Sequence, residues 1–160
     1  MTTTQPQRDP ELDLILTREV DVAPELVWRA WTEPEHLVKW FTPAPWSTVS
    51  AEVDLRPGGI FRTVMRSPEG DEHDNPGCYL EVVEGRRLVF TSVLAPGFRP
   101  VESDLPFTAV ISIEPSGSGT RYTATAMHLD AAGAQRHAEM GFEEGWGAAL
   151  DQLVAWANEL

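Results

Sequence analysis

The chain has 160 residues, of which 42% are hydrophobic and 23% charged, and its formal net charge is −13. These proportions are ordinary for a folded protein, and the length suits one domain with its own core. The acidic excess disfavours nucleic acid and anionic membrane surfaces as partners, and no apolar run of about 18 residues predicts a membrane span.

The first ten residues, MTTTQPQRDP, are polar and contain two prolines. We expect residues 1–10 to form a disordered leader, because no apolar segment of an export signal follows. Residues 11–160 are expected to form a single domain. Cys78 is the only cysteine, so no internal disulfide can form, which suits a reducing compartment. The sequence therefore predicts a cytoplasmic protein.

The N-terminal part of the domain predicts one strand followed by two short helices. Apolar and polar residues alternate from Leu12 to Val22, which is typical of a strand with one buried face. Pro24 is expected to open a helix, where its missing N–H costs nothing. Thr32 is a plausible N-cap for a second helix that ends at Pro43.

The middle of the chain predicts strands joined by turns, and the C-terminal part predicts a helix over 131–160 with apolar residues at helical spacing. Residues 67–77 contain two prolines, two glycines and several acidic residues, which predicts an exposed hairpin loop. The glycines at 141, 145 and 147 indicate a kink, or a place where the helix must not fill space. The predicted strands are residues 49–55, 60–66, 78–83, 87–94, 107–114 and 121–129.

This order predicts an α+β fold. A curved antiparallel sheet of about seven strands would wrap around the long C-terminal helix, which is the element long enough to cover it. The two short helices after the first strand would close one end. Such a sheet is expected to leave an apolar chamber of about 300 Å³ or more beneath the helix.

Several segments resemble a known family. Residues 23–41 read APELVWRAWTEPEHLVKWF, and further matches are the Pro-Gly-Gly turn before Phe61, GCYLEVVEGRRLVFT from Gly77, GTRYTAT from Gly119 and FEEGWGAALDQL from Phe142. The chain is similar to the START-like (SRPBCC) helix-grip superfamily, whose fold is also that of Bet v 1. Within it, the chain resembles the branch related to the C-terminal domain of the Hsp90 ATPase activator (AHSA1-like).

The resemblance implies a cavity between sheet and helix that takes apolar small molecules or lipids. Some relatives are cyclases or dehydrases of aromatic polyketides, and others are binding proteins. The co-chaperone members carry an additional N-terminal domain that this chain does not match, which counts against a role in activating Hsp90. Two positions depart from the family pattern: Phe41 stands where a second Trp is usual, and Ser92 replaces a frequent Trp. The loss of a Trp is expected to enlarge the chamber.

Strand alternation and helical spacing indicate which side chains face this chamber. Small residues such as Ala124 favour an empty space, whereas a plain packed core is the alternative interpretation of the same aromatic residues. The predicted ligand-binding residues are Trp40, Phe41, Phe61, Met65, Tyr79, Phe90, Phe107, Ile111, Tyr122, Ala124, His128, Phe142 and Trp146.

Two residues are candidates for catalysis. His128 shares a face with Tyr122 and could hydrogen-bond or protonate a ligand, or simply be satisfied by backbone groups. Glu81 shares a face with Tyr79 and would be a base only if that face points inward, which the sequence leaves open. Residues 71–74 combine metal-ligating types, but an acidic surface loop explains them better, so we expect no metal and no cofactor.

The sequence therefore favours a cytoplasmic binding protein for a small hydrophobic or amphipathic molecule. Two alternatives use the same fold: an enzyme of the polyketide cyclase, dehydrase or hydrolase kind, and a co-chaperone-like interaction module. The expected partner is a small hydrophobic ligand, with the chain acting as a monomer or a homodimer.

Overall fold

A computed structural model describes residues 9–159 and has the α+β architecture that the sequence predicts. These residues form four helices and ten strands. The helices are α1 (Pro24–Thr32), α2 (Pro34–Trp40), α3 (Ala131–Glu139) and α4 (Phe142–Asn158). The strands are β1 (Asp13–Val20), β2 (Ser47–Val53), β3 (Phe61–Arg66), β4 (Glu72–Asn75), β5 (Cys78–Val83), β6 (Arg87–Thr91), β7 (Leu94–Ala95), β8 (Arg99–Pro100), β9 (Thr108–Ser116) and β10 (Gly119–Met127).

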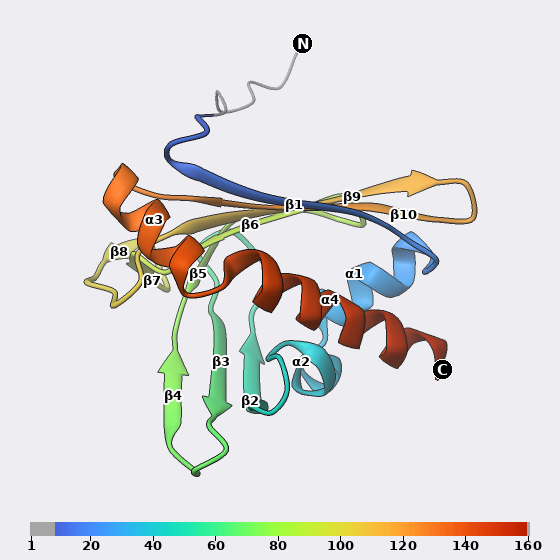
Figure 1. The fold of residues 1–160 in the computed structure, drawn as a ribbon, viewed down its shortest axis with the longest axis horizontal. Helices are drawn as coiled ribbons and strands as arrows, with labels where there is room; N and C mark the ends of the chain where they lie inside the picture. Colours follow the sequence, from blue (N-terminus) through green and yellow to red (C-terminus); the bar gives the residue numbers. More distant parts are fainter. Residues whose placement is uncertain (1–8, 160) are drawn as a thin grey trace.

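The strands form an antiparallel five-stranded sheet in the order β1-β10-β9-β6-β5 and a three-stranded sheet in the order β2-β3-β4. A bridge between Ile60 and Cys78 joins the two. In Figure 1 the five-stranded sheet is seen along its edge, β2–β4 extend away from it, and α4 lies across the inside of the angle. The first strand pairs with the last, so β1 forms the edge under which α4 runs.

A row of buried apolar side chains crosses four of the five strands on the inner face of the five-stranded sheet. Leu16, Ala124, Ile111 and Leu88 follow one another across β1, β10, β9 and β6, and all four are buried. The buried face of α4 packs with them, including Leu153. Period two in the strands and period 3.6 in the helix thus bring apolar side chains from both into one buried core.

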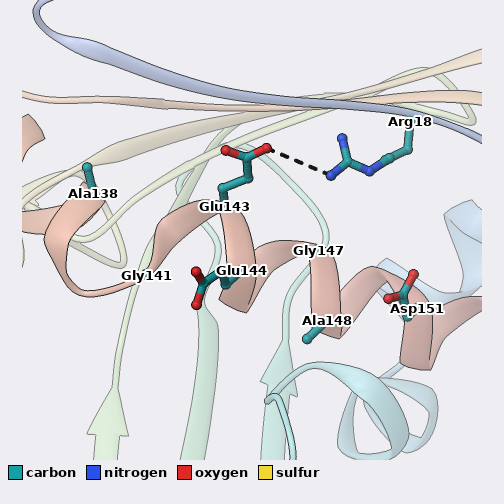
Figure 2. A pocket seen from close by; sticks show the side chains of 8 residues that line it. All are labelled: Arg18, Ala138, Gly141, Glu143, Glu144, Gly147, Ala148 and Asp151. Carbon is teal, nitrogen blue, oxygen red and sulfur yellow. Dashed lines mark ion pairs between the residues drawn. The ribbon is translucent and has the colours of Figure 1, made fainter.

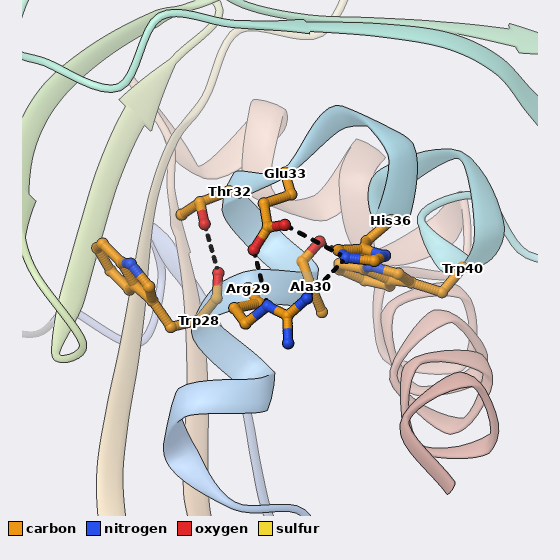
Figure 3. A network of polar contacts seen from close by, with 7 residues as sticks. All are labelled: Trp28, Arg29, Ala30, Thr32, Glu33, His36 and Trp40. Atoms are coloured by element: carbon orange, nitrogen blue, oxygen red, sulfur yellow. Dashed lines mark hydrogen bonds and ion pairs between the residues drawn. The ribbon is translucent and has the colours of Figure 1, made fainter. Parts of the chain in front are cut away.

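A polar network fixes the corner between α1 and α2, shown in Figure 3. Glu33 adopts an extended conformation between the helices, and its carboxylate contacts Arg29 Nε at 2.9 Å and His36 Nε2 at 3.4 Å. The Trp40 indole donates to the carbonyl of Ala30 at 2.9 Å. The predicted N-cap role of Thr32 is wrong, because its hydroxyl donates back into α1, to the Trp28 carbonyl.

The predicted hairpin loop over 67–77 is only partly correct, because its second half is strand β4. Every residue of β4 is exposed, so hydrophobic alternation gives no signal there. Cross-strand ion pairs mark the strand instead: Arg62 Nε lies 2.8 Å from Asp74, and Arg66 contacts Glu72. The segment 95–106 was predicted as a connection, but the structure has two short strands there: β7 begins just before it, and β8 lies within it.

The predicted C-terminal helix is two helices. Gly141 has a φ of 92°, a left-handed conformation that favours glycine, and it separates α3 from α4. The Asp130 side chain caps α3 by accepting from the Gly133 N–H at 2.8 Å. α4 remains the long helix of the predicted fold, with 17 residues.

The predicted leader, residues 1–10, lies almost entirely outside the described residues. Asp9 and Pro10 lead into a turn, in which the N–H groups of Leu12 and Asp13 donate to the carbonyl of Asp9. None of the helices in residues 9–159 is long and apolar enough to cross a membrane.

Gly59 is expected to tolerate no side chain. A Cβ at this position would overlap the backbone carbonyl of Asp54, which neighbouring hydrogen bonds hold in place. We predict that Gly59→Ala lowers the free energy of unfolding by about 1–3 kcal/mol, measured by urea denaturation.

The matched control is Gly147→Ala in α4, where a Cβ meets nothing within 4 Å. This substitution should raise the free energy of unfolding by up to about 1 kcal/mol, because alanine is the better helix former. Equal stability of the two variants would contradict the close backbone approach at Gly59.

Candidate functional site

One end of the inner face is filled by aromatic side chains. The Trp31 ring lies 5.1 Å from Trp40, 5.5 Å from Phe41 and 5.9 Å from Phe90, measured between ring centroids. Trp31 itself was not among the predicted ligand-binding residues. These rings pack edge to face or tilted, so they form a closely packed aromatic cluster around Trp31.

The predicted ligand-binding residues divide into two groups by exposure. Half-buried side chains have an accessible surface from which to contact a ligand. The four half-buried residues of the predicted set come from different elements or connections. The half-buried group is Phe41, Met65, Phe107 and Trp146. The buried group is Trp40, Phe61, Tyr79, Phe90, Ile111, Tyr122, Ala124, His128 and Phe142.

A β-bulge in β5 decides which side chains of residues 78–83 face inward. Tyr79 pairs with Phe90, the register shifts, and Glu81 pairs with Val89. Tyr79 is therefore on the inner face, stacked on Phe61 at 5.3 Å, whereas Glu81 is on the outer face and forms an ion pair with Arg87. The structure thus separates the two residues that the sequence places on one face, and Glu81 is remote from the interior.

Two buried polar atoms of the interior have no hydrogen-bonding partner among the described residues, Tyr79 Oη and Trp31 Nε1. The Trp31 indole lies close to the Tyr122 hydroxyl, without the geometry of a hydrogen bond. Tyr79 is fully buried, and burial raises the pKa of its hydroxyl above the ordinary value, so it stays protonated. An unpaired buried hydroxyl is unusual, because most such groups are hydrogen-bonded.

At the other end of the inner face, two buried histidines form a pair. His128 follows the last strand, and its Nδ1 lies 2.8 Å from the carbonyl oxygen of Leu12 on the neighbouring chain segment. Its Nε2 lies 2.9 Å from Nδ1 of His137, which α3 supplies. Both nitrogens of His128 are thus engaged within the protein, and His137 is the member that has a nitrogen to spare.

The hydrogen bonds determine where the protons lie in the neutral pair. A carbonyl only accepts, so Nδ1 of His128 carries a proton and, in the neutral ring, Nε2 is an acceptor. Nδ1 of His137 must then donate to it, which leaves Nε2 of His137 as an acceptor. Burial and the neighbouring His128 lower the pKa of His137 to about 4, so this ring is neutral at pH 7.

Three aromatic rings surround His137. Its ring centroid lies 5.1 Å from Phe107, 5.2 Å from Phe142 and 6.3 Å from Trp146. Sequence reasoning found these three residues and His128 but missed His137. The available signal was that His137 lies three residues after Ala134, the other buried residue of α3, which is the spacing of one helix face. Because α3 is short and polar, this spacing alone does not identify the buried face.

Comparison with known proteins places the chain in a family. Residues 21–158 match the family described as "Activator of Hsp90 ATPase homolog 1-like protein". This chain belongs to the AHSA1-like family. The match confirms the START-like resemblance seen in the sequence, and the family has the helix-grip fold described above.

Solved structures of similar proteins agree with this assignment. A Nitrosomonas europaea protein is 51% identical, with a TM-score of 0.92 over 95% of this chain and 97% of that chain. The AHSA1 protein from Silicibacter pomeroyi is 26% identical, with a TM-score of 0.69 over 92% of this chain and 99% of that one. A comparison with curated proteins found no match.

The AHSA1-like domain also has a groove on the solvent side of α4, shown in Figure 2. Its volume is about 650 Å³, and it is open to solvent. Glu143, Glu144 and Asp151 line it, and Arg18 faces Glu143 across it at 4.0 Å. The groove is outside the predicted chamber, and three carboxylates on an exposed surface do not suit an apolar ligand.

One group of side chains in the described part of the chain has the spacing of a cation site, namely Glu33, Glu35 and His36. The Arg29 guanidinium already occupies one oxygen of the Glu33 carboxylate, and His36 lies against the other. A positive charge at hydrogen-bonding distance opposes a metal ion, so we interpret the group as the helix-corner network of Figure 3.

Proposed function

We propose that this protein binds a small apolar or amphipathic molecule between the inner face of its sheets and α4. The observation that carries the proposal is the fully buried Tyr79 hydroxyl, which has no partner among the described residues. Burying such a group without a hydrogen bond costs about 1–3 kcal/mol. The hydroxyl is closed off in the free protein, so a polar atom of a bound molecule would offset that cost once neighbouring side chains move aside to admit it.

The packing of α4 supports the proposal, because one side of this helix has fewer contacts than the others. α4 packs mainly against α1, α2, α3 and β1, and less against the β2–β4 sheet. Gly145 lies about two helical turns before Gln152, whose side chain donates to the carbonyls of Trp40 and Thr42. Gly145 is therefore on the same side of α4 as Gln152, which we call the inner flank, and a Cβ there meets nothing within 4 Å.

A pair of substitutions in α4 tests the location of the ligand. Gly145→Leu is expected to fill the space on the inner flank and to weaken binding of an apolar probe at least about tenfold, which corresponds to 1.4 kcal/mol. Gly147→Leu is the matched control, because Gly147 lines the outer groove of Figure 2 and also has open space around it.

Binding would be measured by quenching of tryptophan emission and by the rise in melting temperature with a panel of neutral aromatic and fatty compounds. No response of the wild-type protein to any member of the panel would contradict the proposed function. Equal weakening by both leucine variants would contradict the location on the inner flank.

Tyr79→Phe is predicted to separate stability from binding. Removal of an unpaired buried hydroxyl should leave the free energy of unfolding unchanged or raise it by up to about 1 kcal/mol, as measured by urea denaturation without ligand. The same variant should bind a ligand with a polar group less tightly. A clear loss of stability would show that the hydroxyl already has a partner in the free protein.

A further inference from the structure

We propose that Nε2 of His137 accepts a hydrogen bond from a neutral hydroxyl of the bound molecule, and that this hydroxyl is carried on an aromatic or enolic ring. The inference rests on the proposed function and names the class of ligand. His137 would be a binding residue, and His128 would be the positioning residue that orients it.

The direction of the hydrogen bonds in the histidine pair is the reason why the ligand must carry a hydroxyl group. The chain runs from the Leu12 carbonyl through His128 to His137, and every donor in it points toward Leu12. Its free end is therefore an acceptor, and no described residue donates to it. A ligand that meets this end must supply a donor, which ketones and ethers do not have.

The side chains around Nε2 of His137 are the reason why we expect the hydroxyl to be carried on a ring. Phe107 and Trp146 are half-buried and lie 6.1 Å apart, while Phe142 lies 5.0 Å from Trp146. Flat faces and edges at these distances suit another aromatic ring better than a flexible chain, because ring pairs gain energy beyond their buried area. The acceptor and the ring surface lie at the same corner, beside His137.

Charge excludes the anionic alternatives. A carboxylate or phosphate would need a positive partner, but the pKa of His137 is lowered to about 4, so the ring is uncharged at neutral pH. Glu143 and Glu144 follow Phe142 in the first turn of α4, and the whole chain has a net charge of −13. A neutral phenol or enol meets the acceptor without bringing another negative charge into this region.

The test uses three probes with one ring system: 2-naphthol, 2-methoxynaphthalene and 2-naphthoate. The wild-type protein at pH 7 should bind 2-naphthol about fivefold more tightly than the methoxy compound, as expected for one neutral hydrogen bond, and 2-naphthoate more weakly than either. His137→Phe keeps an aromatic ring but removes the acceptor, so the preference should fall below about twofold. His73→Phe, an exposed histidine on β4, is the matched control and should keep the preference.

The outcomes distinguish the two proposals. Probes that bind without a preference for the hydroxyl, or with the same preference in His137→Phe, would overturn the role of His137 and leave the proposed function standing. No binding of any probe would count against both. Nitrogen NMR of the unsubstituted protein gives a check that needs no variant: Nε2 of His137 should be unprotonated at pH 7, and a proton on it would overturn the inference.

Discussion

Replacing Trp31 by alanine is expected to lower the free energy of unfolding by about 3–5 kcal/mol, the usual cost of deleting a buried aromatic side chain. Trp31 is 2% exposed and contacts Trp40, Phe41, Phe61 and Phe90. It joins α1 to α2, to the connection after α2 and to both sheets. Its loss would leave a cavity where these elements meet. The cavity cannot close, because each surrounding element is held in place by its other contacts.

The matched control is Trp46→Ala. Trp46 is half-buried and lies 5.4 Å from His73 on the exposed strand β4, so its removal opens no internal cavity. We expect a loss of about 1 kcal/mol or less. Urea denaturation followed by far-ultraviolet circular dichroism avoids dependence on tryptophan emission. Similar losses in the two variants would show that the Trp31 cluster is not the packed centre of the domain.

Acidification is predicted to destabilise the protein through His137. The pKa of this residue is lowered to about 4 in the folded protein, by burial first and by the nearby His128 second. In the unfolded chain it should be about 6.5. Between these values the unfolded chain binds a proton that the folded chain does not, so stability is fully present above pH 6.5 and is lost as the pH falls toward 4. The complete loss amounts to about 3 kcal/mol.

The comparison that checks this is the slope of unfolding free energy against pH, between pH 7.5 and 4.5, for the wild-type protein and His137→Phe. The variant should show a shallower slope, whatever its stability at pH 7.5. The pKa of Asp74 is lowered by its hydrogen bonds to Arg62, so its contribution is lost at lower pH in both proteins. Parallel slopes would contradict a buried, neutral His137.

The sequence alone was sufficient for the main elements of the fold. Alternation over Leu12–Val22 predicted β1, the prolines at 24 and 34 marked the first turns of α1 and α2, and helical spacing after Phe142 predicted α4. These signals are local, because burial of one face imposes its period on the residues of one element. These local signals and the sequence of residues 23–41 were enough to identify the family.

Only the tertiary structure decided the details of the interior. The bulge after Tyr79 turned that residue inward and left Glu81 outside, although strict alternation places both on one face. The exposed strand β4 has no apolar period and is held by partners on β3. Register shifts and edge pairing arise from contacts with another strand, so the residues of one strand contain no signal for them.

The histidine pair shows the same division. His128 was a candidate because it shares a face of the predicted strand with Tyr122, but it follows β10 in the structure, and its partners are the Leu12 carbonyl just before β1 and a side chain in α3. The pairing of the first strand with the last brings Leu12 to His128, and the break at Gly141 sets α3 beside them. Hydrogen bonds between groups so distant along the chain depend on how the elements pack, so only the folded structure could identify His137.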